Sequence, residues 1–159
     1  MTNTRRIIFI ILTIIWMVVI FAFSAKDADE SGRTSSIVGL TIGKLVIVEF
    51  DQLPVEEQLA FAEKVDYPIR KTAHALEYMV LGLFITGSIY SSRLSRIVVF
   101  LISWALTTLY AASDEFHQLF VPGRSGEIRD VCIDSVGAIA GVLIGILILS
   151  RLSARKVKK

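Results

Sequence analysis

Cysteine is nearly absent from this sequence of 159 residues, in which Cys132 is the only one. An internal disulfide is therefore excluded, and a single thiol says nothing firm about the redox compartment. The sequence also has no internal repeat and no low-complexity segment, and its length predicts one domain over residues 1–159. It contains no nucleophile elbow, P-loop or phosphatase signature, so no motif of those kinds assigns an enzyme activity.

Charged residues are scarce in four long apolar blocks, and hydrophobic residues make up 53% of the whole sequence. The blocks, at about residues 7–25, 70–90, 97–119 and 128–150, match the roughly 20 residues that a helix needs to cross a bilayer. A signal peptide is the alternative for the first block, but its apolar region exceeds the roughly 7–15 residues usual there. We therefore predict an all-α integral membrane bundle of four transmembrane helices, with the first helix retained.

The connection formed by residues 26–69 is too long to lack structure, because loops beyond about 12–15 residues are uncommon in compact domains. Residues 37–50 carry apolar side chains at helical spacing, which predicts a helix at the interface or packed on the bundle. A strand is the alternative, since part of this stretch is β-branched. Pro54 and the two acids after it favour a helix start, and Tyr67-Pro68 predicts its end.

Acidic residues are absent from the amino-terminal segment, from the turn between the second and third blocks, and from the basic tail at residues 151–159. The same parts carry nine basic residues: Arg5, Arg6, Arg93, Arg96, Arg151, Arg155, Lys156, Lys158 and Lys159. Lys and Arg in short segments beside membrane spans mark the cytoplasmic side. We therefore expect both termini to be cytoplasmic, and residues 26–69 to form one long extracytoplasmic connection between the first two transmembrane helices.

Polar residues recur at helical spacing on the last three blocks, so each block is expected to have one polar face. The faces are, in order, Lys71, His74 and Glu77 or Tyr78; Ser103, Thr107, Tyr110, Asp114 and His117 or Gln118; and Asp130 with Asp134. The topology places the charged ends of all three faces on the extracytoplasmic side. We therefore expect His74, Glu77, Asp114, His117, Arg124, Asp130 and Asp134 to form one cluster there.

Glycine recurs every fourth residue on the last block, at Gly137, Gly141 and Gly145. Small residues at this spacing let two helix backbones approach closely. Because Asp130 and Asp134 lie in line with this seam, they are expected to point into the bundle. The same glycine face also offers a contact for an oligomer.

At these residues the sequence resembles the VanZ-like family of membrane proteins. The matching pieces are Trp16 with Phe23-Ser24, Lys71-x-x-His74-x-x-Glu77-Tyr78, Ser113-Asp114-Glu115-Phe116-His117-Gln118, Pro122-Gly123-Arg124 and Asp130-x-x-x-Asp134-x-x-Gly137. The family is named for a protein that gives low-level resistance to the glycopeptide teicoplanin. The resemblance implies a multi-pass protein of the bacterial plasma membrane and raises glycopeptide resistance as a hypothesis, but it supplies no reaction.

Ionisable residues at a membrane boundary are costly, so they need partners or a task. The candidates for acid–base catalysis are His74, Glu77, Asp114 and His117, since imidazoles exchange protons near neutral pH. The candidates for substrate binding are Lys71, Tyr78, Gln118, Arg124, Arg129, Asp130 and Asp134. Among these, the cations suit a phosphate, to which arginine gives bidentate contacts.

Three functions fit this pattern. The chain could bind or handle an anionic membrane lipid or lipid-linked wall precursor; it could be an enzyme acting on a lipid-linked or phosphorylated substrate; or the charges could form a closed structural network. His74 with Glu77, and Asp114 with His117, have the spacing of helical metal-binding pairs. The nearby cations would repel a metal, so we expect no metal, no cofactor and no nucleic-acid partner.

Overall fold

The computed structural model of the chain describes residues 3–91 and 93–157, and every regular element within them is helical. The elements are α1 (Asn3–Ser24), α2 (Ala28–Val46), the short 3-10 turn η1 (Phe50–Gln52), α3 (Val55–Ile89), α4 (Arg96–Gln118) and α5 (Ile128–Val157). This confirms the all-α prediction. The strand considered for residues 37–50 is wrong, because α2 continues to Val46 and η1 follows.

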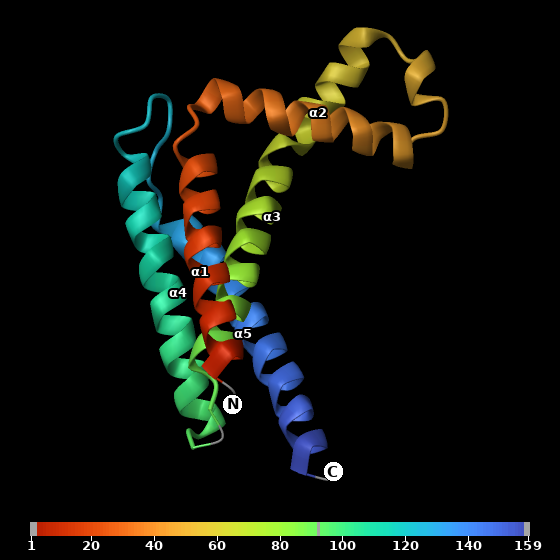
Figure 1. Cartoon of the computed structure of the whole chain (residues 1–159). Coiled ribbons are helices and arrows are strands. Elements are labelled where there is room, and N and C mark those ends of the chain that lie inside the picture. The colour runs from red at the N-terminus through yellow and green to blue at the C-terminus, as the bar shows by residue number, and fades with distance from the viewer. Residues whose placement is uncertain (1–2, 92, 158–159) are drawn as a thin grey trace.

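Four helices, α1, α3, α4 and α5, are long and apolar enough to cross a membrane. They run from one end of the bundle to the other, with α5 crossing obliquely behind the others, and both ends of the chain lie at the same end of the bundle (Figure 1). α2 crosses the opposite end at a steep angle to them. The predicted bundle of four transmembrane helices is thus confirmed, and the direction of its helices gives the direction of the membrane normal.

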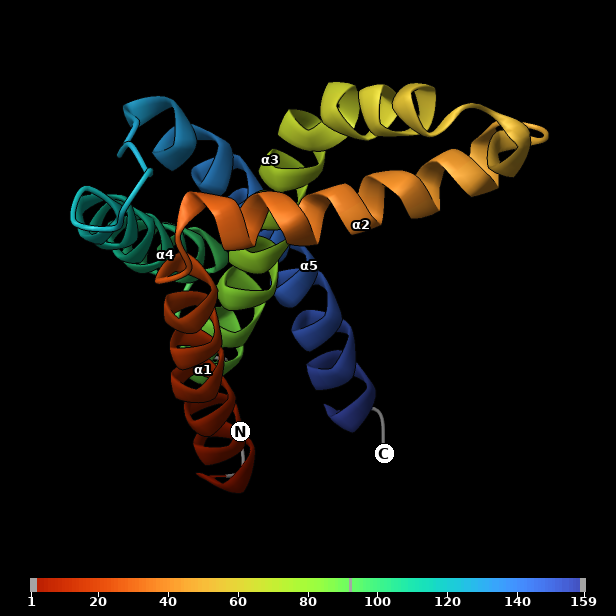
Figure 2. The same ribbon diagram turned by 90° about the horizontal axis from the view of Figure 1, so that it is seen from above.

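α3 is longer than the sequence predicted, because it begins at Val55 and continues through Pro68 to Ile89. The predicted helix end at Tyr67 is therefore wrong. A proline inside a helix removes one hydrogen bond and favours a kink. Pro68 is exposed, so water can satisfy the carbonyl left without a partner. Figure 2 shows α3 running alongside α2 before it turns down into the bundle.

The last helix is also longer than predicted, since α5 extends to Val157 rather than ending near residue 150. The added residues are mostly Leu, Ala, Arg and Lys, which are good helix formers. Cations near a helix C-terminus are also favoured by the helix dipole. The start of α5 at Ile128 agrees with the predicted one.

The glycine seam packs α5 against α3. A side chain at Gly137 or Gly141 would overlap the backbone carbonyl of Ala75 or Met79, respectively. From the other side, a Cβ at Gly82 would lie 2.8 Å from the carbonyl oxygen of Ala138. The seam is therefore buried within one chain, and an oligomer through this face stays a prediction that would require α3 to be displaced.

α3 is the centre of the bundle, because it packs against α1, α2, α4 and α5. Its Tyr78 and Leu81 are fully buried with Ile20 of α1 and Ala111 of α4. The carboxyl-terminal half of α3 is thereby fixed in rotation about its axis. This rotation decides which of its polar residues face α5 and which face α1 and α2.

Candidate functional site

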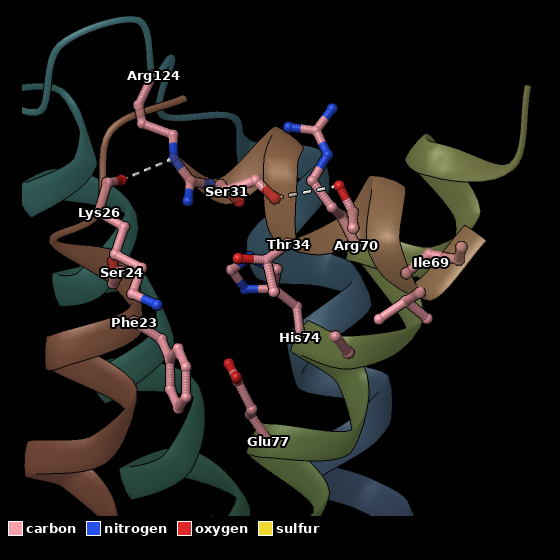
Figure 3. A pocket seen from close by; sticks show the side chains of 13 residues that line it. Phe23, Ser24, Lys26, Ser31, Thr34, Ile69, Arg70, His74, Glu77 and Arg124 are labelled. Carbon is pink, nitrogen blue, oxygen red and sulfur yellow. Dashed lines mark hydrogen bonds between the residues drawn. The ribbon is translucent and has the colours of Figure 1, made fainter. Parts of the chain in front are cut away.

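A cavity of about 180 Å³ lies between the end of α1, the underside of α2 and the first membrane turns of α3. Its walls carry apolar, hydroxyl and charged side chains, contributed by Phe23, Ser24, Lys26, Ser31, Thr34, Ser35, Val38, Ile69, Arg70, Ala73, His74, Glu77 and Arg124. Figure 3 shows Phe23 and Lys26 on one side, with His74 and Glu77 opposite. Three segments that are far apart in sequence therefore build one site.

Cations outnumber acids around this cavity. Lys26, Arg70 and Arg124 line it, whereas Glu77 is the one acid among the lining residues. Arg70 is paired with Asp66 on α3, at 2.9 Å between Nη2 and Oδ2. Within the described part of the chain, no carboxylate lies within 4.0 Å of Lys26 or Arg124. The cavity therefore carries positive charge that the protein does not neutralise by direct ion pairs.

Arg124 is placed by the loop between α4 and α5. Gly123 has a φ of +72°, a left-handed conformation that glycine adopts without strain. The neighbouring Pro122 carbonyl accepts a hydrogen bond from the Ala28 N–H at 3.3 Å. Arg124 Nε donates to the Lys26 carbonyl, also at 3.3 Å. Together these bonds fasten the loop to the beginning of α2.

The surroundings of Arg124 are unfavourable for its own charge. Burial lowers the pKa of the Arg124 guanidinium, and the positive charge of Arg70 lowers it further, although Glu115, Asp114 and Asp130 act in the opposite direction. An arginine remains charged in proteins in spite of such shifts. An anion in the cavity would therefore be stabilised by a charge that the folded chain leaves incompletely compensated.

Ser24 adds a buried donor to the cavity. Ser24 is only 3% exposed and lines the cavity, and its Oγ has no hydrogen-bond partner among the residues that the structure describes. A buried polar group without a partner costs stability, so such groups often mark a ligand or water position. The prediction of site residues missed Ser24, Lys26 and Arg70. The signals available were the Phe23-Ser24 pair and the position of Arg70 one helical turn before His74.

His74 and Glu77 are the two predicted catalytic residues that reach the cavity. The Nδ1 atom of His74 is buried, and within residues 3–91 and 93–157 it has no hydrogen-bond partner. Glu77 presents its carboxylate between α1 and α3, and its backbone carbonyl accepts a bond from Trp16 Nε1 at 2.9 Å. An imidazole and a carboxylate thus flank a cationic cavity, which is a chemically competent arrangement for proton transfer.

Lys71, Arg129 and Asp130 form a separate group between α3 and α5. Lys71 Nζ forms an ion pair and hydrogen bond with Asp130 Oδ2. The Tyr67 ring lies beside both cations, 5.3 Å from Lys71 Nζ and 5.0 Å from Arg129 Cζ. None of these residues lines the cavity. The polar face predicted for α3 is therefore divided: Lys71 contacts α5, whereas His74 and Glu77 line the cavity.

Buried carboxylates occupy the space among α3, α4 and α5. Asp114 is 4% exposed and Asp134 is 1% exposed, while Tyr78 has no exposed surface. Asp114 Oδ1, both Asp134 carboxylate oxygens and the Tyr78 hydroxyl have no hydrogen-bond partner in the described chain. Gln118 Nε2 donates to Asp114 Oδ2 at 3.4 Å. These predicted site residues are therefore brought together in the bundle interior, and none of them lines the cavity.

His117 lies apart from the cavity. Its ring centroid is 4.6 Å from that of Phe21 on α1, and its Nδ1 is buried with no hydrogen-bond partner among the described residues. Asp114 lies one helical turn before His117, but no hydrogen bond joins the two side chains. Across the described residues, no three His, Cys, Asp or Glu side chains are grouped closely enough to hold a metal ion.

Comparison with known proteins gives one match. A family model described as VanZ/LLP1 matches residues 9–149, which include most of α1, all of α2 to α4 and most of α5. The match covers every residue that lines the cavity. No curated protein and no solved structure gives a significant match to the chain.

Proposed function

The chain belongs to the VanZ/LLP1 family of membrane proteins. We propose that it binds an anionic, phosphate-bearing ligand of the bacterial envelope. The ligand is a lipid headgroup or a cell-wall precursor, held in the cavity between α1, α2 and α3. The observation that carries this proposal is the excess of cations there, with Lys26 and Arg124 free of ion pairs among the described residues.

Each lining group has a role in this proposal. Arg124 offers a planar fork of donors that suits phosphate oxygens, and Lys26 adds a mobile point charge. The Ser24 hydroxyl, which has no partner among the described residues, donates a hydrogen bond to the ligand. Arg70 contributes less charge, because Asp66 already pairs with it. Lys71 and Arg129, which the sequence also suggested for binding, are engaged with Asp130 and Tyr67 instead.

The proposed orientation follows from charge. With the basic termini in the cytoplasm of a bacterial cell, the cavity faces the extracytoplasmic side, where wall precursors and outer-leaflet lipids are exposed. A role in teicoplanin resistance, which the family name implies, would then act through the ligand in this cavity. Acid–base catalysis on the same ligand is a second function. It is supported by His74 and Glu77, which line the cavity beside the cations.

The test is native mass spectrometry of the full chain, purified in mild detergent with its co-purifying lipids. We expect the wild type to retain a phosphate-bearing molecule and Arg124→Gln to lose it. Arg33→Gln is the matched control, because Arg33 is exposed on α2 and does not line the cavity. Unfolding is measured in parallel. Retention by Arg124→Gln at unchanged stability, or equal loss in both variants, would contradict the proposal.

The enzymatic function needs a separate measurement. If His74 transfers a proton, His74→Gln should still retain the ligand, while conversion of that ligand stops. Retained ligand from wild type and from His74→Gln is compared by its mass. Chemically identical ligand in both, after incubation with the purified protein, would favour binding without catalysis.

A further inference from the structure

We propose that α2 lies on the membrane surface and that the ligand reaches the cavity sideways, beneath α2, as a membrane lipid whose acyl chains remain in the bilayer. This inference rests on the proposed anion site and adds the source and chemical class of the ligand. It is carried by three observations: the direction of α2 with the faces that it presents, the depth of the cavity, and the volume of the cavity.

The direction of α2 is the first observation. It crosses the end of the four membrane-spanning helices rather than running along them (Figures 1 and 2). One face of α2, with Ser35, Gly39 and Gly43, is buried. A Cβ at Gly39 would lie 3.1 Å from the Cα of Ala62 on α3. α3 therefore holds α2 in the plane of the membrane surface.

Part of the remaining surface of α2 forms an apolar strip beside the cavity. At about 100° per residue, Thr34, Val38 and Leu45 fall within an arc of about 40°. This arc faces the cavity, which Thr34 and Val38 line. Leu45 is 80% exposed and Val38 is 41% exposed, so neither is covered by the chain. An exposed apolar strip that continues from the roof of the cavity is suited to contact with lipid.

Charged residues occupy another arc of α2, centred about 130° from the apolar strip. Asp29, Arg33 and Lys44 lie there, and all three are exposed, with the exposed Ile37 at the edge of the same arc. A helix with one apolar and one charged face lies in the plane of the membrane interface, with the charged face in water. The sequence of α2 and its direction therefore agree on a surface-lying helix.

The depth of the cavity is the second observation. Ser24 is the last residue of α1, and Lys26 lies two residues later, so the cavity lies where the apolar run of α1 ends. This is the depth of the lipid headgroups. Lys26 Nζ lies 4.9 Å from the centroid of the Phe23 ring, and Phe23 is half-exposed beside the bilayer. A phosphate at this depth meets the cations, while attached chains meet Phe23.

The volume is the third observation. Sites for complete small-molecule ligands usually measure about 300–1,000 Å³, whereas this cavity measures about 180 Å³. It accommodates a headgroup and leaves the rest of a lipid outside. Phe23 and Val38, which line the cavity and are both exposed, offer apolar surface for the acyl chains. A soluble anion without acyl chains would make no contact with that apolar surface.

The first experiment tests the position of α2. The full chain, with Cys132→Ser, carries an NBD fluorophore at Leu45→Cys or, as the control, at Arg33→Cys, and is reconstituted into phosphatidylcholine nanodiscs. We expect doxyl-labelled lipids to quench the probe at residue 45 several-fold more strongly than the probe at residue 33. Equal and weak quenching at both positions would overturn the surface-lying α2.

The second experiment tests the source of the ligand. Nanodiscs with phosphatidylglycerol that carries a diazirine in one acyl chain are irradiated, and the cross-linked peptides are mapped. We expect cross-links at Phe23 or Val38, and about a tenfold loss with Val38→Trp, which narrows the entrance. Arg33→Trp, on the charged face, is the control. Unfolding measurements show whether each variant remains folded.

The outcomes separate this inference from the proposed function. Arg124-dependent binding of soluble glycerol 3-phosphate, with no cross-link at the entrance, would overturn sideways entry and leave the anion site standing. Cross-links that persist in excess glycerol 3-phosphate and fall with Val38→Trp would support a lipid from the bilayer. Failure of both probes to bind, together with no phosphate-bearing molecule retained by the wild type in native mass spectrometry, would remove the proposed function as well.

Discussion

The ion pair between Lys71 and Asp130 gives the sharpest test of how the charged residues are divided. Lys71 was a candidate for ligand binding, but in the structure it contacts Asp130 across the interface of α3 and α5. If this contact is structural, changing either residue should lower stability without removing the ligand. We consider Lys71→Met, Asp130→Asn and the double variant.

The expected magnitude follows from burial. The side chains of Lys71 and Asp130 are 21% and 13% exposed, between a surface pair and a buried one. Exposed pairs contribute about 0.2–1 kcal/mol, whereas removing one partner of a buried pair costs about 3–5 kcal/mol. We therefore expect each single change to cost about 2–3 kcal/mol. Asp130→Asn should cost more, because it leaves Lys71 and Arg129 beside Tyr67 without the carboxylate.

The assay is equilibrium unfolding in mixed micelles with increasing SDS, followed by circular dichroism. The double variant should be less destabilised than the sum of the single changes, by a coupling of about 1–2 kcal/mol. Native mass spectrometry of the folded proteins should show the ligand retained in all three. Tyr67→Leu is a control that removes the aromatic ring and leaves the ion pair.

Two results would refute this reasoning. Additive effects in the double variant would mean that the two side chains do not stabilise one another. Loss of the ligand from Lys71→Met, at wild-type stability, would mean that Lys71 belongs to the binding site after all. In that case the cavity beneath α2 would be only part of the site.

Further predictions concern packing and topology. In thermal unfolding, Gly141→Ala should destabilise the protein by about 1–3 kcal/mol or more, because its Cβ would overlap the Met79 carbonyl. Gly32→Ala is the control: its Cβ would meet nothing within 4 Å, so the stability should be unchanged or higher. Tyr110→Phe removes a 2.7 Å hydrogen bond to α1 and should cost about 0.5–1.5 kcal/mol, a prediction contradicted by unchanged unfolding. A cysteine at Leu94, in a background without the native thiol, should resist impermeant maleimide in intact cells; labelling from outside would reverse the proposed topology.

The four membrane-spanning helices could be predicted because an apolar run of sufficient length has few other stable states. The glycine seam could also be predicted, since close backbone approach requires the absence of side chains at a fixed spacing. The continuation of α3 through Pro68 could not be predicted. A proline lowers the preference for a helix locally, but packing of α3 against α2 outweighs it and fixes the continuous helix.

The sequence also could not predict which charged residues pair with one another and which line the cavity. Lys71 and His74 are about 60° apart around the helix axis, close enough to be assigned to one face. The burial of Tyr78, which lies seven residues after Lys71, turns this side of α3 inward, and the Lys71–Asp130 pair joins it to α5. His74 is thereby turned toward the cavity. Rotation of a helix about its axis is set by its neighbours, and spacing alone does not specify it.

The bond from Arg124 to the Lys26 carbonyl has a consequence for biogenesis. It joins positions 98 residues apart in the chain. A membrane protein is synthesised from its amino terminus, so α1, α2 and α3 are made before the loop that carries Arg124. The order of synthesis makes Arg124 the last of the cavity's cations to emerge from the ribosome. A nascent chain that has inserted only its first two membrane-spanning helices therefore has the walls of the cavity without its main phosphate-binding group, and the site becomes complete only after α4 has been inserted.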